Sequence, residues 1–421
     1  MPKNSVIIIG GGISGLSSAR YLAKAGWAVT VLEKGNFTDG CSYGNAGFVC
    51  PSHYIQLATP GIAKQGLKWM LKSTSPFYIQ PRLDPALLRW GVHFLKRAKQ
   101  KYVTQNAASL RDIGLLSQNE YEQVWLGEMD FDYQHKGMLE VFQTQAAFKE
   151  CTHIAKIGQD LGLEIEMLDK TGLSELEPDT EWNAMGAVYY KCDGHLNPAK
   201  LMRGLYNNLE SLGVQLRANQ QVTGFKKQGP LITEVYAGEN SFKADAVVLA
   251  AGSWSEQLAR QLHLNLPVVG GRGYSFMVPV QNHHRIHRPG LLVEGRAAFT
   301  PLGNELRFGG TMEIRNLDAP MSLNRVKGII NAVENFFPDY RGQLDFNKIK
   351  PAIWSGFRPV SVDGMPYIGK SPSIENLVVA TGHAQLGISL GAATGLLVSE
   401  LVRRVDTSIN ITTFGINRFN N

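Results

Sequence analysis

The stretch VIIIGGGISGLSSARYLAKAGWAVTVLE, residues 6–33, shows how the chain begins to fold. Its first four residues are all apolar, as a strand buried on both faces requires, and the run stops at glycine. Residues 10–15 then fit G-x-G-x-x-G, in which Gly10 makes the tight turn, Gly12 lets the backbone approach a pyrophosphate and Gly15 allows close helix packing. The helix that follows directs its N-terminus at the phosphates. The stretch therefore predicts a strand, a turn and a helix that bind a dinucleotide.

A second strand, at residues 28–32, ends at Glu33. A carboxylate at this position can accept hydrogen bonds from both ribose hydroxyls of an adenosine, and it would repel a 2′-phosphate. The alternative is an ordinary strand–helix–strand turn, because glycine-rich turns are common. All the parts of the dinucleotide motif occur in the required order, which favours dinucleotide binding. The pattern itself does not distinguish NAD from FAD.

Length and composition limit the class of protein. A chain of 421 residues is too long for one small core and predicts two or three domains. Its 44% hydrophobic and 19% charged residues are ordinary for a soluble globular protein. The net charge of +6 comes without a block of lysine and arginine, so a nucleic-acid partner is not expected.

Cysteine usage and the lack of long apolar runs predict a cytoplasmic protein. The apolar N-terminal run continues into the glycine motif, so it is read as part of the fold and not as a signal peptide. No run approaches the roughly 20 apolar residues that span a bilayer. The chain has four cysteines, Cys41, Cys50, Cys151 and Cys192, with neither a C-x-x-C pair nor zinc-like spacing. No metal site is predicted, and a solvated loop is favoured for the histidines at 283, 284 and 287, which no carboxylate or cysteine joins.

The rest of the chain predicts a fold that is split in sequence. Helical periodicity covers residues 86–126, and strands and helices follow to residue 337. Two further buried strands, within 245–254 and 377–383, end in small residues, and a helix is predicted from 387 to 404. The last strand and helix of the dinucleotide fold thus lie far from its first strand. We therefore expect an α/β dinucleotide-binding domain, interrupted by a mixed α+β substrate-binding domain.

The segment at residues 62–72 is amphipathic, with lysines at 64, 68 and 72 on one stripe. Packing against the core is the favoured interpretation. Peripheral contact with the inner face of the cytoplasmic membrane is the alternative.

Motifs along nearly the whole chain resemble the glycine oxidase/D-amino acid oxidase superfamily of flavoproteins, and most closely its bacterial D-amino acid dehydrogenases. The resemblance rests on the glycine motif with Glu33 and on five later segments: Tyr43-Gly44-Asn45-Ala46-Gly47, Leu67-Lys68-Trp69-Met70, Gly273-Tyr274-Ser275, Gly356-Phe357-Arg358-Pro359 with Asp363-Gly364, and Thr381-Gly382-His383 with Leu386-Gly387. It implies a Rossmann-like, glutathione-reductase-type FAD domain at 1–60, 193–262 and 354–421. The substrate domain would then occupy 61–192 and 263–353.

The resemblance also implies the site residues. The cofactor would be FAD, with its flavin ring between the 45–47 loop and the 382–383 turn. Its contacts would be Gly10, Gly12, Ile13, Ser14, Gly15, Glu33, Lys34, Ser42, Asn45, Ala46, Gly47, Val222, Ala251, Gly252, Gly356, Gly382, His383, Leu386 and Gly387. Arg358 would hold a substrate carboxylate with its planar fork, and Tyr274 would be a second donor. His53 and Tyr54 could line the pocket or pack in the core, and His383 is expected to contact the flavin through its backbone and not to act as a base.

By the same resemblance, the activity is oxidative deamination of D-amino acids to 2-keto acids and ammonia. Hydride passes from the substrate Cα to flavin N5, and the electrons pass to a quinone or another acceptor. The alternatives are a hydroxy-D-proline or D-proline dehydrogenase, a glycine/sarcosine-type oxidase that uses oxygen, and a non-catalytic flavin-binding protein. The last cysteine is Cys192, so covalent flavin attachment at a late cysteine is not expected and FAD should be bound non-covalently.

Overall fold

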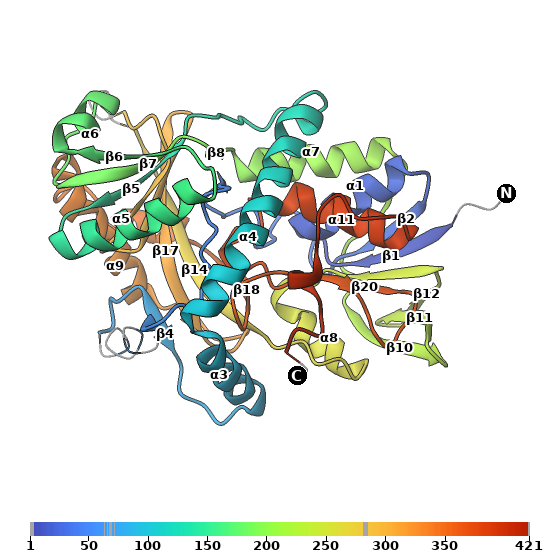
Figure 1. Ribbon diagram of the computed structural model, residues 1–421. Coiled ribbons are helices and arrows are strands. Elements are labelled where there is room, and N and C mark those ends of the chain that lie inside the picture. The colour runs from blue at the N-terminus through green and yellow to red at the C-terminus, as the bar shows by residue number, and fades with distance from the viewer. Residues whose placement is uncertain are drawn as a thin grey trace.

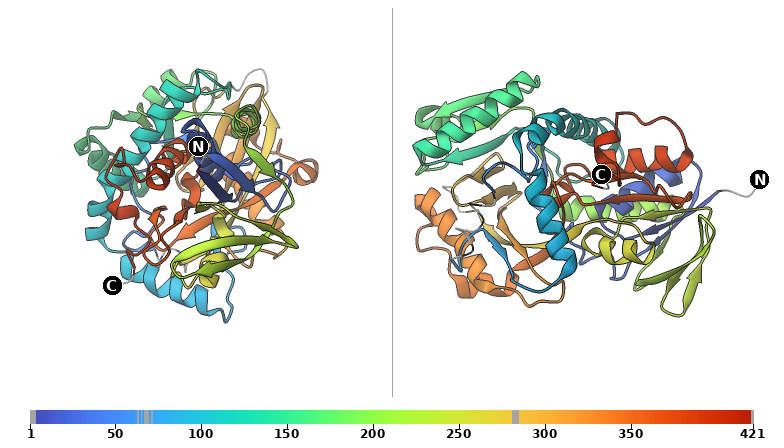
Figure 2. Two further views of the ribbon diagram at one scale, coloured as in Figure 1. Left: turned by 90° about the vertical axis from the view of Figure 1, so that its right-hand side faces the viewer. Right: turned by 60° about the horizontal axis from the view of Figure 1, so that its bottom comes forward.

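The computed structural model describes residues 4–62, 64, 66, 70, 72–280 and 285–419. Two sheets dominate it, and each forms the centre of one half of the molecule (Figure 1). In Figure 2, the blue N-terminal and red C-terminal elements share one half, whereas the orange elements from the later middle of the chain lie in the other. The two ends of the chain therefore build one half together, and the split α/β fold predicted from the sequence is confirmed.

The smaller of the two sheets is the predicted dinucleotide-binding sheet. At its centre, β1 (Ser5–Ile9) runs parallel to β2 (Ala28–Leu32) on one side and to β13 (Ala246–Leu249) on the other. The residues of β1 after Ser5 are all buried, as expected of a strand covered on both faces. The sheet continues through β20 (Leu377–Thr381) and antiparallel β19 (Tyr367–Lys370) beyond β13, and through β9 (Gln215–Arg217) beyond β2.

Two helices from opposite ends of the sequence pack on this sheet. Helix α1 (Ile13–Lys24) connects β1 to β2, and α11 (Gly391–Arg403) packs against it. A Cβ on Gly395 would lie 2.5 Å from the backbone of Ser17, so the glycine allows this close approach. Helix α11 begins at residue 391 and not at the predicted 387, because a 3-10 turn at Ala384–Leu386 precedes it.

The larger sheet has nine strands and carries the substrate half. Its order is β18 (Trp354–Ser361), β14 (Val268–Pro279), β17 (Glu305–Ile314), β16 (Ala297–Leu302), β15 (Gly290–Leu292), β5 (Met138–Phe142), β7 (Gly186–Tyr190) and β6 (Ile165–Asp169), with β4 (Phe77–Ile79) paired to β17. The pairing places β18 beside β14. The predicted boundary at residue 354 is therefore wrong at this strand, which belongs to the larger sheet and not to the dinucleotide-binding sheet.

The remaining elements surround these sheets. A three-stranded sheet of β10 (Val222–Gln228), β11 (Leu231–Ala237) and β12 (Asn240–Phe242) and a short pair of β3 (Phe48–Val49) and β8 (Gly194–His195) complete the strands. Among the described residues, the other α-helices are α3 (Pro85–Arg97), α4 (Gln100–Glu120), α5 (Gln145–Asp160), α6 (Lys170–Leu176), α7 (Pro198–Ser211), α8 (Ser255–Gln261), α9 (Leu323–Phe336) and α10 (Phe346–Ile349). Asn197 caps α7 by accepting from the backbone N–H groups of Ala199 and Lys200.

Two sequence predictions fall largely outside the described residues. Most of the amphipathic segment 62–72 lies there, as do the histidines at 283 and 284. Within the described residues, no helix combines the length and the apolar character that crossing a membrane requires.

Candidate active site

The glycine turn after β1 has the geometry that its sequence predicts. Gly10 has a φ of +112°, and a Cβ on it would lie 2.4 Å from the carbonyl oxygen of Ala250. A Cβ on Gly15 would lie 1.9 Å from the carbonyl oxygen of Gly10. By contrast, a Cβ on Gly12 would meet only the Ser42 hydroxyl, at 3.7 Å. Gly10 and Gly15 thus serve the fold, whereas Gly12 lies on the open side of the turn, where it N-caps α1 without a side-chain cap.

Glu33 lies at the end of β2 beside this turn. Its carboxylate accepts hydrogen bonds from the backbone N–H groups of Gly11 at 2.6 Å and Gly35 at 2.8 Å. Its carbonyl oxygen accepts from the backbone N–H of Gln220, two residues before Val222. Lys34 lies over the ring of Trp254, 3.1 Å from the ring centroid. The predicted adenosine contacts around Glu33 therefore lie close together in space.

The ends of β13 and β20 meet next to the glycine turn. The Thr381 hydroxyl donates to the carbonyl oxygen of Gly252 at 3.0 Å, which ties the two strand ends together. Gly382 follows with a φ of +80°. A Cβ on Gly387 would lie 3.7 Å from the side chain of Ile13, so the turn after β20 reaches the start of α1. These contacts bring most of the predicted nucleotide-binding segments to one edge of the smaller sheet.

The loop at residues 41–47 connects the glycine turn to the larger sheet. Ser42 accepts from the backbone N–H of Ile13 at 3.1 Å. On the other side, Arg307 donates to the carbonyl oxygen of Asn45 at 2.6 Å, and Thr300 donates to that of Ala46 at 2.8 Å. Gly47 has a φ of +82° and leaves no room for a Cβ beside the carbonyl oxygen of Leu196. The loop predicted to face the flavin is thus held by both halves of the molecule.

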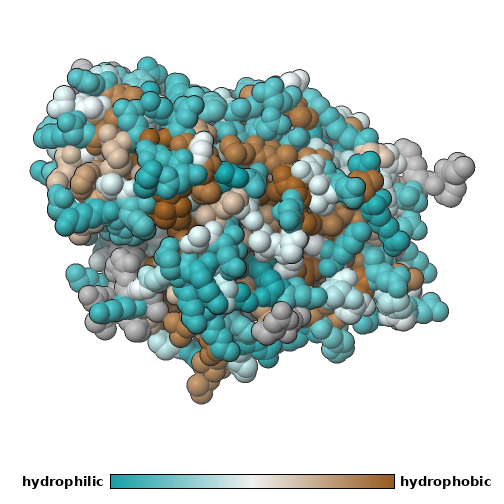
Figure 3. All heavy atoms as spheres, in the orientation of Figure 1, coloured by the Kyte–Doolittle hydropathy of each residue, from teal (hydrophilic) through white to brown (hydrophobic). Residues whose placement is uncertain are grey.

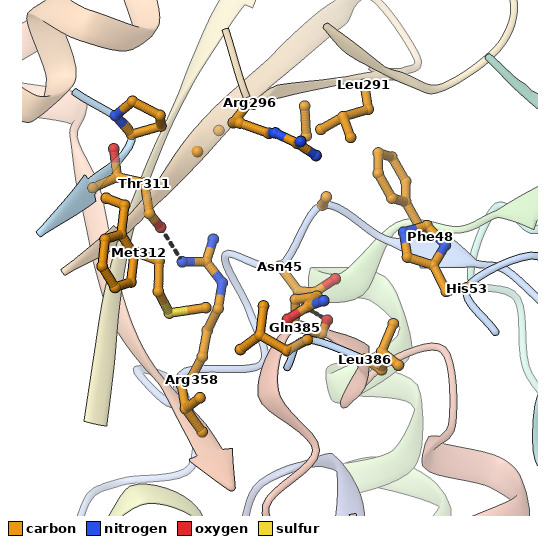
Figure 4. A pocket seen from close by; sticks show the side chains of 18 of the residues that line it. Asn45, Phe48, His53, Leu291, Arg296, Thr311, Met312, Arg358, Gln385 and Leu386 are labelled. Atoms are coloured by element: carbon orange, nitrogen blue, oxygen red, sulfur yellow. Dashed lines mark hydrogen bonds between the residues drawn. The ribbon is translucent and has the colours of Figure 1, made fainter. Parts of the chain in front are cut away.

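A cavity of about 680 Å³ extends from this loop into the larger sheet. Figure 4 shows Arg358 and Arg296 on opposite walls, each with its guanidinium directed into the open space, and Asn45, Gln385 and Leu386 on a third wall. Arg358 comes from β18, and one of its Nη atoms donates to the carbonyl oxygen of Thr311. Its guanidinium lies against Gly273, where a Cβ would be only 2.0 Å from Nη1.

Arg358 remains a cation despite its burial. Burial lowers the pKa of Arg358 to about 10, and Cys41 is the group that opposes this shift. Among the ion pairs between described residues, none joins Arg358 to a carboxylate. A buried guanidinium with donors to spare is suited to an anionic ligand.

Tyr274 does not serve as the predicted second donor. Its hydroxyl donates to the Glu313 carboxylate at 2.7 Å and accepts from the backbone N–H of Ser322 at 2.9 Å. The Tyr274 side chain packs in the core cluster that includes Val326 and Ile329 of α9, whereas Gly273 is the residue that faces the Arg358 guanidinium. The prediction for Tyr274 is wrong because its one hydroxyl proton is already used in a buried network behind the sheet.

His53 and Tyr54, which were both considered for the pocket wall, lie in different environments. His53 lines the cavity, and burial lowers the pKa of its imidazole to about 4. Tyr54 is fully buried in the core, where its hydroxyl donates to the carbonyl oxygen of Ile154 at 2.7 Å. His383 is also buried, and its Nε2 lies 3.0 Å from the Thr394 hydroxyl on α11. That contact turns its ring toward the helix, so the imidazole of His383 is not placed to act as a base in the cavity.

Several cavity residues were missed by the sequence analysis. Arg296 directly precedes β16 with a φ of +47°, and Glu140 comes from β5. Burial raises the pKa of the Glu140 carboxyl, which accepts from the Tyr190 hydroxyl at 3.0 Å. Trp354 lies against both Gly44 and Gly356, where a Cβ would meet its ring at 2.0 and 2.2 Å. Of these side chains, only Trp354 had a signal in the sequence, namely the two glycines against which its ring packs.

Cys50, His53 and Asp193 also come together beside the cavity, with one potential ligand atom of each within 4.8 Å of the others. Hydrogen bonds explain their placement, because Ser52 donates its backbone N–H and its hydroxyl to the Asp193 carboxylate. Burial raises the pKa of Asp193 to about 7 and that of the Cys50 thiol well above its usual range. Burial therefore disfavours the deprotonated forms of both groups, which are the forms that bind metals.

Comparison with known proteins agrees with this geometry. Residues 5–401 match the DAO family, described as FAD dependent oxidoreductases. The chain is 30% identical to a D-amino acid dehydrogenase of Paramagnetospirillum magneticum, with 98% of each chain covered. It is 28% identical to a D-amino acid dehydrogenase of Vibrio atlanticus, with 98% of this chain and 99% of the relative covered.

Solved structures show the same fold. Glycine oxidase from Geobacillus kaustophilus superimposes with a TM-score of 0.75 at 25% identity, covering 99% of both chains. The L-proline dehydrogenase from P. horikoshii superimposes with a TM-score of 0.73 at 18% identity, covering 100% of this chain and 99% of that one. The family match and the likeness in fold each extend over nearly the whole chain. The protein therefore belongs to the DAO family of FAD-dependent oxidoreductases.

Proposed function

We propose that this protein oxidises D-amino acids to 2-keto acids and ammonia and passes the electrons to a quinone or a similar acceptor. The observation that carries the proposal is Arg358, a buried guanidinium that faces the cavity without a carboxylate partner among the described residues. A carboxylate is the part common to all amino acids, and a planar guanidinium can bind it through two parallel hydrogen bonds. The relatives named D-amino acid dehydrogenase support the D-enantiomer as substrate.

FAD fits the residues that are present. Gly12 leaves the turn open for a pyrophosphate, and Glu33 is available beside it for the ribose. The cavity begins at Asn45 and Ala46, where a flavin ring would reach from the nucleotide end toward Arg358. We infer that FAD is held by these contacts without a covalent bond.

The side chains of the cavity would bind and orient the substrate. Arg358 would hold the carboxylate, and the contacts of its guanidinium with Thr311 and Gly273 limit its movement. Positioning of this kind can account for much of the rate of a reaction that needs little acid–base help. Bound FAD supplies the two-electron acceptor for the hydride from Cα, and the imine product hydrolyses in water to the keto acid and ammonia.

Arg296 is a better candidate than Tyr274 for the second substrate contact. Its guanidinium faces the cavity opposite Arg358, and its left-handed backbone conformation is uncommon outside glycine. Strained backbone of this kind is often kept where a side chain must point in one direction. We infer that Arg296 forms a second contact with the substrate, at either its carboxylate or its side chain.

The electron acceptor and the location of the protein are also proposals. The resemblance to D-amino acid dehydrogenases favours a quinone over oxygen, with the protein in the cytoplasm or on the inner face of the membrane. Hydrogen peroxide formed at the same rate as keto acid, with no acceleration by added quinone, would contradict this part.

Anaerobic reduction of the bound flavin tests the proposed activity. The holoenzyme is mixed with D-alanine, other D-amino acids, D-proline, hydroxy-D-proline, glycine and sarcosine, with the L-enantiomers as matched controls. Bleaching by D-amino acids and not by L-amino acids is expected. Bleaching by the cyclic imino acids alone, or by glycine and sarcosine alone, would replace the proposed substrate. No bleaching by any of them would contradict the amino-acid function.

A further inference from the structure

Helix α3 exposes apolar side chains on the face that points away from the protein. Leu87 and Trp90 are buried on its inner face, and the Trp90 indole donates to the carbonyl oxygen of Val360 at 3.1 Å. On the outer face, Leu88, Val92 and Leu95 are 59%, 53% and 58% exposed. Their spacing of four and three residues puts them on one stripe. A surface helix of a soluble protein usually carries polar residues on that face.

The loop before α3 extends this stripe. Leu83 is 100% exposed, directly before the N-cap Asp84. Figure 3 shows apolar side chains that protrude at the lower edge of the molecule, where Figure 1 places α3. Isolated exposed leucines are common on proteins, but four large apolar side chains on one helix and its entry loop form a patch.

Basic residues surround the patch. Residues 82–101 include six lysines and arginines and one acidic residue, Asp84. Asp84 pairs with Arg82 at 3.1 Å, and Arg97 donates to the backbone of Arg418. Arg89, Lys96, Lys99 and Lys101 are exposed, and no ion pair is recorded for them among the described residues. Glu256 on α8 is the other carboxylate near Arg89.

The helix that carries the patch also lines the candidate active-site cavity. Trp90, Gly91, Phe94 and Leu95 all line that cavity, and Leu95 is also one of the exposed residues of the stripe. The inner face of α3 therefore forms cavity wall, while its outer face is directed at solvent. The same helix thus borders both the cavity and the solvent.

We propose that the α3 patch, Leu83, Leu88, Val92 and Leu95, inserts into the interface of an anionic lipid bilayer. Apolar side chains flanked by cations fit this partner, since the chains bury in the headgroup region while the cations attract anionic lipids. Docking in this way would bring the cavity to the lipid surface, where a lipid-soluble quinone could approach it. That consequence rests on the proposed quinone acceptor, whereas bilayer binding itself does not.

A second copy of the chain fits the patch less well. A symmetric contact places the same surface of both copies face to face, so Arg89 and Lys96 would approach their own copies. The stripe is also one helix wide, whereas a stable interface buries roughly 800 Å² on each partner. Charge and size together favour the bilayer.

Vesicle flotation with the holoenzyme tests the inference. The probes are vesicles of phosphatidylcholine alone and vesicles with 30 mol% phosphatidylglycerol, roughly the range of anionic surfaces found in cells. The wild type is expected to float with the anionic vesicles and much less with the neutral ones. A Leu83→Gln, Leu88→Gln, Val92→Gln variant should lose at least about tenfold in partitioning, because each change removes apolar area from the bilayer. Leu95 is left unchanged because it also lines the cavity.

A matched control carries Met185→Gln, Leu231→Gln and Met321→Gln, whose side chains are 45%, 41% and 47% exposed elsewhere on the surface. This control should float like the wild type, and both triple variants should keep wild-type turnover with a water-soluble acceptor. Equal losses in both variants, or a wild type that stays out of the anionic vesicles, would overturn the inference. A concentration-dependent dimer that the α3 variant abolishes, without vesicle binding, would assign the patch to a second copy. Vesicle binding without flavin reduction by D-amino acids would contradict only the proposed function.

Discussion

The two ends of the candidate site are built in different ways. At the nucleotide end, one stretch of residues 6–33 supplies the strand, the turn, the helix and the carboxylate, with only short contributions from β13 and the turn after β20. At the cavity end, Arg358, Arg296, Glu140 and His53 come from four separate segments, spread over more than 200 residues. A local motif can therefore be recognised by the spacing of its residues along the chain. The cavity residues have no fixed spacing in the sequence, so no such pattern identifies them.

The two ends also differ in which substitutions they tolerate. Near the glycine turn, the backbone leaves no space for a Cβ at Gly10 or Gly15. In the cavity, the identity and charge of long side chains matter more. Substitutions at the nucleotide end should therefore reduce folding or FAD content. Substitutions at the cavity end should instead reduce the rate of reaction with the substrate.

The largest effect is expected for Gly10→Ala. The new methyl group would overlap the Ala250 carbonyl at 2.4 Å, in a backbone conformation with a φ of +112°. The φ alone costs about 1–3 kcal/mol and the overlap adds to it, so most of the protein should be insoluble or unfolded. Gly12→Ala is the matched control, since its methyl group meets only the Ser42 hydroxyl at 3.7 Å. It should fold but contain less FAD, and equal soluble yields for both variants would contradict this division of roles.

The next effect is expected for Arg358→Met. Removing the guanidinium leaves a substrate carboxylate without its charged partner, which typically costs about 3–5 kcal/mol, or 10²–10³-fold or more in the efficiency of flavin reduction. FAD content should stay near that of the wild type, because Arg358 lies away from the nucleotide end. The Arg358→Lys variant should recover only part of the efficiency of flavin reduction, because lysine presents a point charge where a planar two-donor group is needed. Anaerobic stopped-flow reduction and flavin content are measured together, and a Met variant that keeps both would place the carboxylate elsewhere.

A smaller, pH-dependent effect is expected for Asp193→Asn, beside the cavity. Burial raises the pKa of Asp193 to about 7 from the ordinary 3.8, so the folded state binds its proton more tightly than the unfolded chain does. The contribution of this group to stability is therefore present below about pH 4 and lost as the pH rises through 7, by as much as about 4 kcal/mol. The Asn Oδ1 can accept from the Ser52 backbone N–H, its Nδ2 can donate to the Ser52 hydroxyl, and the side chain does not titrate.

The gain in Tm of Asp193→Asn over the wild type should accordingly be larger at pH 8 than at pH 5. Asp160→Asn, at an exposed ion pair on α5, serves as the control and should show little change with pH. A gain that is the same at both pH values would show that Asp193 is not protonated in the folded protein.

The smallest effect on activity is expected for Tyr274→Phe. Its hydroxyl bonds to Glu313 behind the sheet, so flavin reduction should stay within about threefold of the wild type, while stability falls by about 1–3 kcal/mol because a buried acceptor loses a donor. Arg296→Met should show the reverse, with an apparent substrate affinity at least about tenfold weaker and a smaller change in Tm. If Tyr274→Phe impairs the reaction more than Arg296→Met does, the sequence-based assignment of Tyr274 should be restored.

Much of the fold could be read from the sequence because its signals are local. The strands β1, β2, β13 and β20, the caps of α7 and the helices of residues 85–120 follow from apolar periodicity and from glycine, asparagine and proline at their ends. Two predictions failed where pairing between distant strands decides the outcome. Residues 354–361 joined the larger sheet through hydrogen bonds to β14, and the same pairing set the face to which Tyr274 points.

The dinucleotide motif can be recognised without a structure, because a pyrophosphate is bound by backbone and helix geometry that a few glycines dictate. Which side chains face the substrate cavity depends instead on how distant strands pair. Along β14, Gly273, which makes room for Arg358, is followed directly by Tyr274, whose side chain is buried away from Arg358. A one-residue change in strand register exchanges the two faces, and that register depends on strand partners far along the chain, such as Gly310 and Ser355 opposite Tyr274. Arg296 and the α3 patch became visible for the same reason, since exposure and direction are properties of the packed molecule.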